Sequence, residues 1–283
     1  MYRILQKQVL SDVTKLMVVE APQVARAARA GQFVIVRSHD HGERIPLTIA
    51  DFDRSAGTIT LIFQEVGKST MEMGKFEPGQ SFATVAGPLG HPTEIENFGT
   101  VVCVGGGVGI APLYPIARAL KEAGNTVITI IGARTKDLLF WEDRMAAISD
   151  QIIVTTDDGS YGRKALVTEP LKEILESRPG QVAHCWAIGP AVMMKFVSAT
   201  TKPFAVPTVV SLNTVMIDGT GMCGGCRVLL ADGAQFVCVD GPEFDGHKVD
   251  WSNLMSRLSY YKAEEQEAIE HWQHVCNLDK ALA

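Results

Sequence analysis

The sequence lacks an excess of positive charge and has no long run of basic residues. Lysine and arginine together number 26, against 32 aspartates and glutamates, which gives a formal net charge of −6. A protein whose main partner is nucleic acid needs clustered cations to meet the phosphate backbone. We therefore expect no nucleic acid among its partners.

The sequence also lacks an apolar leader and an uninterrupted membrane-spanning segment. Arg3 and Lys7 place charge at the start of the chain, and no long apolar run follows them. Residues 97–117 carry no charge, but their five glycines and two prolines indicate a strand, a glycine turn and the start of a helix. We expect no membrane association and a location in the reducing cytoplasm, where clustered cysteines indicate a metal site rather than disulfides.

The chain has enough residues for two domains and an appendage: 283, of which 46% are hydrophobic. Residues 1–97 hold short β-branched runs between turn signals, which predicts an antiparallel β-barrel. Residues 98–210 alternate strand-like and helix-like segments, which predicts an α/β domain with a parallel sheet. Residues 211–245 are rich in glycine and cysteine, and residues 246–283 are predicted to form a helical tail. Within the α/β region we predict helices over residues 111–123, 137–148, 167–175 and 191–200.

Three of the six cysteines lie in or just after a glycine-rich segment, Asp218-Gly-Thr-Gly-Met-Cys223-Gly-Gly-Cys226, with Cys238 further along. The spacing matches the C-x4-C-x2-C pattern of plant-type ferredoxins, with Asp218 in the place of the first cysteine. Glycines let the backbone wrap closely around a cluster, and thiolates suit iron. The segment therefore predicts a [2Fe-2S] cluster held by Asp218, Cys223, Cys226 and Cys238.

Alternatives to this cluster remain open. A zinc site with three cysteines and one aspartate is one of them. The alternative function for the chain is a non-enzymatic iron–sulfur or zinc regulator. Zinc sites usually show paired C-x2-C knuckles, however, and this sequence has one. Cys103, Cys185 or Cys276 could replace Asp218 as the fourth ligand. The first two lie in apolar runs and are expected in the core.

A second glycine-rich segment follows a predicted strand and opens a helix. It contains Gly107, Val108, Gly109 and Pro112, and this context is typical of a phosphate-binding turn at a helix N-terminus. Three further turns follow strands of the same region, at Gly132-Ala133-Arg134, at Asp157-Asp158-Gly159 and at Gly189-Pro190. Because ligands of open α/β sheets bind at the carboxyl ends of strands, we expect these turns to converge on one nucleotide. Each turn taken alone also fits ordinary turn chemistry.

Together these motifs resemble those of the ferredoxin-NADP reductase superfamily. Arg44-x-Pro46-Leu47-Thr48 is similar to its flavin signature, with Arg44 toward the flavin phosphates or ring edge and Leu47 and Thr48 against the ring. The resemblance implies FAD in the barrel, NAD(P) in the α/β domain and the cluster in residues 211–245.

Three more segments match that superfamily. Gly67-Lys68-Ser69-Thr70 is similar to its second flavin element, which binds the pyrophosphate. The turn from Gly107 to Pro112 matches its nucleotide turn, with Val108 replacing a hydroxyl residue. Gly189-Pro190-x-x-Met193 matches the turn beside the nicotinamide, with Ile188 replacing a cysteine.

The order of barrel, nucleotide domain and cluster loop narrows the resemblance to electron-transfer subunits. The chain is similar to those of dihydroorotate dehydrogenase, and more similar to the small subunits of NADH-dependent ferredoxin:NADP oxidoreductases, also called sulfide dehydrogenases. The latter share the aspartate of residues 216–226, whereas the dihydroorotate subunits normally have four cysteines.

The resemblance implies a flavin-dependent NAD(P)H oxidoreductase subunit that uses NAD(H), FAD and [2Fe-2S]. It also implies a larger partner with a second flavin and [4Fe-4S] clusters, and ferredoxin as an indirect partner. The complex would couple NADH and reduced ferredoxin to NADP reduction, or bifurcate electrons in reverse. We expect no catalytic side chain, because the cofactors carry the chemistry. The sequence contains signals for both NAD and NADP. Arg134 and Lys136 would favour the 2′-phosphate of NADP, whereas Asp157 and Asp158 would repel it. The resemblance favours NAD(H).

Overall fold

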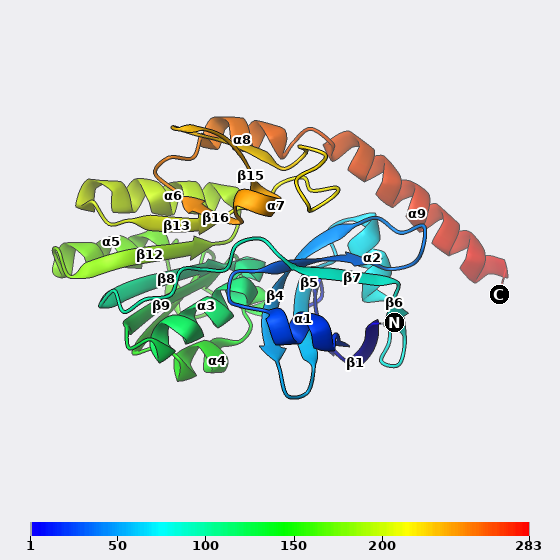
Figure 1. Cartoon of the computed structure of the whole chain (residues 1–283), viewed down its shortest axis with the longest axis horizontal. Coiled ribbons are helices and arrows are strands. Elements are labelled where there is room, and N and C mark those ends of the chain that lie inside the picture. Colours follow the sequence, from blue (N-terminus) through cyan, green and yellow to red (C-terminus); the bar gives the residue numbers. More distant parts are fainter. Residues whose placement is uncertain (1, 283) are drawn as a thin grey trace.

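The computed structural model describes residues 2–282, and it describes side chains as far as His274. Within that range the strands form two seven-stranded sheets and a two-stranded ribbon. Figure 1 shows the two large sheets side by side, with the C-terminal segment along one edge of both. The expected Cys276 side chain lies outside the described residues.

The first sheet is a nearly closed antiparallel barrel with the strand order β6-β1-β2-β5-β4-β3-β7. Ile49, Leu61 and Val34 are among the buried residues that fill it. The predicted barrel is thereby confirmed. Its elements are β1 (Tyr2–Val9), β2 (Thr14–Glu20), α1 (Pro22–Ala27), β3 (Phe33–Arg37), β4 (Ile45–Asp53), β5 (Thr58–Gln64), α2 (Lys68–Gly74), β6 (Ser81–Phe82) and β7 (Thr84–Leu89).

The second sheet has the order β11-β10-β9-β8-β12-β13-β16, parallel from β11 to β13 and antiparallel at β16. Helices α3 and α4 pack on one face of it, and α5 and α6 on the other. The predicted α/β arrangement is confirmed. Its elements are β8 (Thr100–Gly106), α3 (Ile110–Glu122), β9 (Thr126–Ala133), α4 (Glu142–Ala147), β10 (Gln151–Thr156), β11 (Arg163–Lys164), α5 (Thr168–Ser177), β12 (Val182–Ile188), α6 (Ala191–Thr201) and β13 (Thr208–Ser211), with 3-10 turns at Gly107–Gly109, Lys136–Leu138 and Lys202–Phe204.

The single helix predicted over residues 137–148 is wrong. A 3-10 turn ends at Leu138, and α4 begins only at Glu142, after Trp141 adopts a left-handed backbone with φ 58°. The apolar run that suggested a helix instead buries Phe140 and brings the Trp141 ring over Arg144, at 4.2 Å from the guanidinium carbon. Tertiary packing of these aromatic residues thus overrides the local helical pattern.

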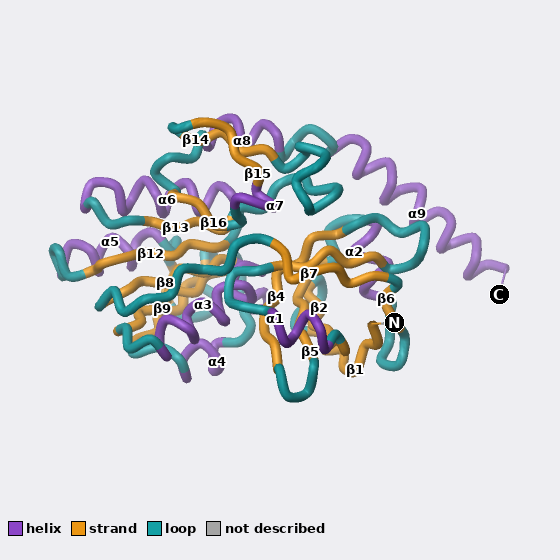
Figure 2. Tube along the Cα trace, viewed as in Figure 1, coloured by secondary structure: helices purple, strands orange, loops and turns teal. Residues whose placement is uncertain are grey.

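The segment after β13 folds back onto the second sheet instead of standing apart. Its elements are β14 (Arg227–Leu230), β15 (Gly233–Phe236), α7 (Val237–Asp240), β16 (Glu243–Asp245), α8 (Trp251–Arg257) and α9 (Lys262–Leu282). The expected helical tail is therefore two helices, and Figure 2 shows α9 extending beyond the body of the molecule. No helix within the described residues is both long enough and apolar enough to cross a membrane.

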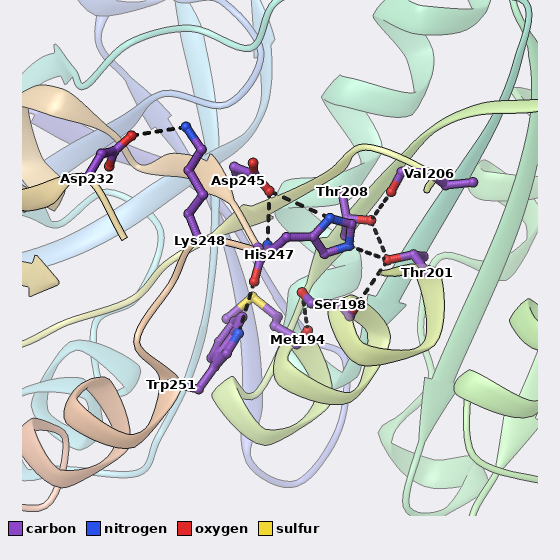
Figure 3. Close-up of polar contacts among 11 residues, drawn as sticks. Met194, Ser198, Thr201, Val206, Thr208, Asp232, Asp245, His247, Lys248 and Trp251 are labelled. Carbon is purple, nitrogen blue, oxygen red and sulfur yellow. Dashed lines mark hydrogen bonds and ion pairs between the residues drawn. The ribbon is translucent and has the colours of Figure 1, made fainter. Parts of the chain in front are cut away.

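A partly buried polar network fastens this segment to the α/β region (Figure 3). The Nε2 atom of His247 lies 2.9 Å from the Thr201 hydroxyl, which in turn lies 2.6 Å from the Thr208 hydroxyl. The backbone N–H of His247 donates to Asp245, and the Trp251 indole donates to the Gly246 carbonyl over 3.0 Å. The loop after β16 is thus tied to α6 and β13.

Candidate cofactor sites

A cleft of about 790 Å³ lies between the barrel and the parallel sheet. It brings together the start of β4, the first turn of α2, the glycine turn before α3 and the end of β12. The predicted site residues that line it are Arg44, Pro46, Leu47, Thr48, Thr70, Val108, Gly109, Pro112 and Gly189. Segments more than a hundred residues apart in the sequence therefore meet at one cavity. This is the size and character expected of a site for a large cofactor.

The glycine turn and the end of β12 touch each other through their backbones. A Cβ on Gly109 would lie 2.2 Å from the carbonyl oxygen of Ile188, and a Cβ on Gly106 would lie 2.3 Å from the Met193 sulfur. Gly107 has a positive φ of 55°. The two predicted nucleotide turns are therefore packed together, while Pro190 and Met193 lie beside the cleft rather than among the residues that line it.

The predicted second flavin element forms the first turn of α2. The Thr70 hydroxyl accepts hydrogen bonds from the backbone N–H groups of Val66 and Gly67, each at 3.1 Å. The Ser69 hydroxyl donates to the Glu43 carboxylate, which joins α2 to the loop before Arg44. The first N–H groups of a helix have no intrahelical acceptor, so the turn at Lys68 and Ser69 offers donors to an anion.

Arg134 and Asp157 lie together at the carboxyl ends of β9 and β10. The N–H of Asp157 donates to the carbonyl of Ala133 over 3.1 Å, and both side chains are exposed. Neither lines the cleft. Hydrogen bonds from Ser160 lower the pKa of Asp158, whose carboxylate is thereby engaged within its own loop.

The cysteine loop is organised by its own backbone. The Asp218 carboxylate accepts hydrogen bonds from the Thr220 hydroxyl at 2.6 Å and from the N–H groups of Thr220 and Met222, which lower the pKa of Asp218. Gly219, Gly221 and Gly224 all have positive φ, a conformation that side chains with a Cβ rarely adopt. The loop is therefore shaped by Asp218 and by glycines.

The three thiols of the loop differ in exposure. Cys226 and Cys238 are buried with their sulfur atoms 3.2 Å apart, and Cys223 is exposed. Backbone N–H groups donate to two of these sulfurs, from Gly225 to Cys223 and from Cys238 to Cys226, each at 3.4 Å. Hydrogen bonds from the Gly225 and Asp218 N–H groups lower the pKa of Cys223, whereas burial and then Cys226 raise that of Cys238.

The donor set of the cysteine loop fits an iron–sulfur cluster in its chemistry. N–H groups aimed at sulfur and glycines that permit close approach are what a cluster needs. Within residues 2–274, no group of three or more histidine, cysteine or acidic side chains is already placed to hold a metal ion. The adjacent sulfur atoms of Cys226 and Cys238 are the part of the predicted ligand set that the structure brings together.

The two alternative cysteines within the described side chains lie in the sheet core. Cys103 is on β8 and Cys185 on β12, and both are fully buried. Burial raises the pKa of the Cys103 thiol and raises that of Cys185 to about 12, so both remain protonated. Their placement fits packing rather than ligation.

Arg44 links the cleft to the cysteine loop. It lines the cleft, and its Nη2 atom donates to the backbone carbonyl of Asp218 over 3.0 Å. A residue of the predicted flavin motif and a predicted cluster ligand, 174 residues apart, are thus in direct contact.

Sequence reasoning missed two parts of the cleft. The stretch between β13 and the cysteine loop lines it from Ser211 to Ile217, and so does Glu265 of α9. The first could have been found, because it follows the carboxyl end of a parallel strand, where ligands of such sheets bind. Nothing in the sequence signals Glu265.

Comparisons with known proteins bear directly on this arrangement. The model of the family described as "Oxidoreductase NAD-binding domain" matches residues 103–199, and that described as "Iron-sulfur cluster binding domain of dihydroorotate dehydrogenase B" matches residues 213–250. A protein of Thermotoga maritima, named as a homolog of the electron transfer subunit of dihydroorotate dehydrogenase B (NAD(+)), is 50% identical over 90% of this chain and 89% of its own. The chain belongs to the family of dihydroorotate dehydrogenase B electron transfer subunits.

Other members of the family support the same assignment. The electron transfer subunit of Desulforamulus reducens is 32% identical over 88% of this chain and 97% of its own. Among solved structures, a chain of an NADH-dependent reduced ferredoxin-NADP oxidoreductase, reported for its bearing on flavin-based electron bifurcation, superposes with a TM-score of 0.91. It is 46% identical and covers 96% of this chain and 98% of that chain. The predicted resemblance and the electron-transfer role are confirmed.

Proposed function

We propose that this subunit carries electrons between NAD(H), an FAD in the cleft and a [2Fe-2S] cluster on the cysteine loop. It is a flavin-dependent NAD(P)H oxidoreductase subunit, with FAD on residues 1–97, nucleotide on 98–210, the cluster on 211–245 and a helical tail from 246. The observation that carries the proposal is the shared cleft, which is lined by the flavin motif, the nucleotide turn and the approach to the cysteine loop.

FAD, when bound, converts between two-electron hydride transfer and single-electron transfer. The chain itself provides placement and exclusion of water. Leu47 and Thr48 contact the ring system and Arg44 binds its edge or its phosphates. Gly67, Lys68, Ser69 and Thr70 bind the pyrophosphate at the α2 turn. Gly107, Val108, Gly109 and Pro112 hold the nucleotide phosphates, and Gly189, Pro190 and Met193 shape the nicotinamide side.

The cluster is assigned to Cys223, Cys226, Cys238 and Asp218. The buried pair provides two ligands whose sulfur atoms are already adjacent, and the exposed Cys223 completes the C-x2-C pair. A carboxylate at Asp218 is a harder ligand than thiolate, and it distinguishes this loop from a site with four cysteines.

The partner we propose is a larger flavin and [4Fe-4S] subunit, with ferredoxin reaching the complex through it. Large apolar side chains are exposed around the cysteine loop: Met222 is 89% exposed, and Ile217, Tyr260 and Tyr261 are each about half exposed or more. A patch of this kind next to an electron outlet favours a docked partner. The solved relative named above is an NADH-dependent reduced ferredoxin-NADP oxidoreductase. We infer the same coupling here, in the cytoplasm, running as confurcation or in reverse as bifurcation.

We propose NAD(H) as the nucleotide of this subunit. Asp157 and Asp158 are both exposed carboxylates close to Arg134, so they oppose the attraction of Arg134 and Lys136 for a 2′-phosphate. Flavin reduction measured with NADH and NADPH tests this assignment, and a strong preference for NADPH would contradict it.

The central test is a visible spectrum of the purified protein with cofactor and metal analysis. We expect flavin bands with an iron–sulfur shoulder that dithionite bleaches, FAD in the acid extract, and two irons and two sulfides per chain for a [2Fe-2S] cluster. A colourless protein with zinc would contradict the proposal and favour the regulator.

The dihydroorotate dehydrogenase relatives favour a second candidate, in which the partner oxidises dihydroorotate. Co-purification with the partner subunit separates the two. Orotate formation coupled to NAD reduction would support the second candidate, whereas NADP reduction requiring both NADH and reduced ferredoxin would support the first.

A further inference from the structure

One ionic cluster joins the barrel to the α/β region away from the cleft. Asp51, on β4, forms salt bridges with two arginines. Its Oδ1 atom lies 2.8 Å from Nη1 of Arg118 on α3, and its Oδ2 atom lies 2.5 Å from Nη2 of Arg144 on α4. The Asp51 side chain is 17% exposed. Both oxygens of one half-buried carboxylate thus bind cations from two helices of the neighbouring sheet.

Aromatic rings hold both arginines in place. The Arg118 guanidinium lies 5.2 Å from the Tyr114 ring centroid and 5.7 Å from that of Phe52. Arg144 lies 4.4 Å from the ring of Tyr114. A guanidinium fixed by stacking loses less entropy on pairing than a free one, so this cluster is stronger than an ordinary surface ion pair.

Two of the three elements joined by Asp51, strand β4 and helix α3, meet in the cleft. Strand β4 carries the flavin motif at its start and Asp51 three residues after Thr48, about 10 Å along the strand. Helix α3 carries Pro112 in its first turn and Arg118 six residues later, about 9 Å along the helix. The cluster therefore sits at a similar distance from the cleft on both elements and fixes the flavin side against the nucleotide side.

We propose that Asp51 is a positioning residue that sets the separation between the flavin and nicotinamide sites by clamping β4 to α3 and α4. The inference rests on the proposed function. Hydride transfer depends steeply on the separation of donor and acceptor, because a misplacement of about 1 Å can cost a factor on the order of 100 in rate. Arg144 extends the clamp to the turn at Trp141, which replaced the predicted helix.

The test compares Asp51→Asn, which keeps the size of the side chain but removes its charge, with wild-type holoprotein. We expect the limiting rate of flavin reduction by NADH in stopped flow to fall about tenfold or more, while the dissociation constant for NADH stays within about twofold. The long-wavelength charge-transfer absorbance of the nicotinamide–flavin complex should weaken in parallel. Asp51→Glu retains the charge and should recover part of both signals.

Asp150→Asn is the matched control. Asp150 binds Lys121, one turn beyond Arg118 on the same helix, at 2.6 Å, but this pair lies within the α/β region. The control should lose thermal stability without losing the charge-transfer band or the limiting rate. Equal behaviour of the two variants, or a wild-type rate and band in Asp51→Asn, would overturn the proposal.

Two further measurements keep the proposal testable. If Asp51→Asn does not fold, Arg118→Gln and Arg144→Gln replace it. Each of these variants removes one of the two salt bridges of Asp51, and each should lower the limiting rate of flavin reduction. Hydrogen exchange of peptides from β4 and α3 should accelerate in Asp51→Asn but not in Asp150→Asn, with or without flavin. A wild-type protein without FAD or without reduction by NADH would defeat the proposed function, and unchanged exchange would defeat the clamp.

Discussion

The cleft and the cysteine loop are neighbouring regions that owe their shapes to different forces. The cleft lies between two sheets whose cores are filled by buried side chains, and its turns are in backbone contact at Gly109 and Ile188. The loop from Asp218 to Cys226 is held by hydrogen bonds to one carboxylate and by glycines, and Cys223 is exposed. The shape of the cleft therefore comes from the packing of two sheets, whereas the shape of the loop comes from local hydrogen bonds and glycine backbone.

The largest effect should follow from removing a buried thiol of the loop. Cys226→Ser should abolish the cluster, because Cys226 is buried beside Cys238 and a serine hydroxyl is a poorer ligand for iron than a thiolate. Flavin content should stay near wild type, because neither Cys226 nor Cys238 lines the cleft. Iron analysis and electron paramagnetic resonance of the reduced protein check this, with Cys103→Ala as a control that keeps its iron. Loss of flavin together with iron would show that the two regions are not independent.

A change at the glycine turn should damage the cleft and spare the loop. In Gly109→Ala the new Cβ would lie 2.2 Å from the carbonyl oxygen of Ile188. Because that atom belongs to the backbone, relieving the clash requires the main chain to shift. We expect a loss of about 3 kcal/mol in the free energy of unfolding and weakened NADH binding. Denaturant unfolding measures the loss of stability. Gly67→Ala is the control, because a Cβ at Gly67 meets nothing within 4 Å and the φ angle of Gly67 is −139°. Similar losses in both variants would contradict the packing argument.

A pH effect should arise at Glu243, the first residue of β16, which follows Pro242 of the cleft wall. Burial raises the pKa of Glu243 to about 7, against the hydrogen bond that Thr93 donates over 2.7 Å. Because the folded pKa lies above the unfolded value of about 4.3, the folded state binds more protons between these pH values, and stability falls as pH rises from about 4.3 to 7. Glu243→Gln should remove this slope and stabilise the protein at pH 8 by about 2 kcal/mol. Unfolding curves at pH 5, 6, 7 and 8 check it, and an unchanged slope in the variant would show that another group titrates.

Most of the fold could be predicted because its signals are local. Turn residues punctuate the barrel strands, and the alternation of strand and helix follows from hydrophobic periodicity. The helix over 137–148 could not be judged from sequence, because its break depends on Trp141 meeting Arg144 and Tyr114 in three dimensions. The same limit hid the clamp at Asp51, whose partners lie 67 and 93 residues away. Motifs located one wall of the cleft, but Glu265 enters it from a helix that carries no motif.

The smallest expected effect concerns the ligand that distinguishes this loop. Asp218→Cys should retain a cluster, because the replaced position matches the first cysteine of the ferredoxin spacing. Its midpoint potential should change, since thiolate donates differently from carboxylate. The Thr220 and Met222 N–H groups would also lose their acceptor, so the loop should exchange its amide protons faster before the cluster is loaded. Redox titration followed by electron paramagnetic resonance measures the potential, and Asp232→Cys, an exposed aspartate on the β14–β15 turn, is the control. An unchanged potential and spectrum in Asp218→Cys would point to a different fourth ligand. Asp218 would then have only a structural role, as the hydrogen-bond acceptor that shapes the loop.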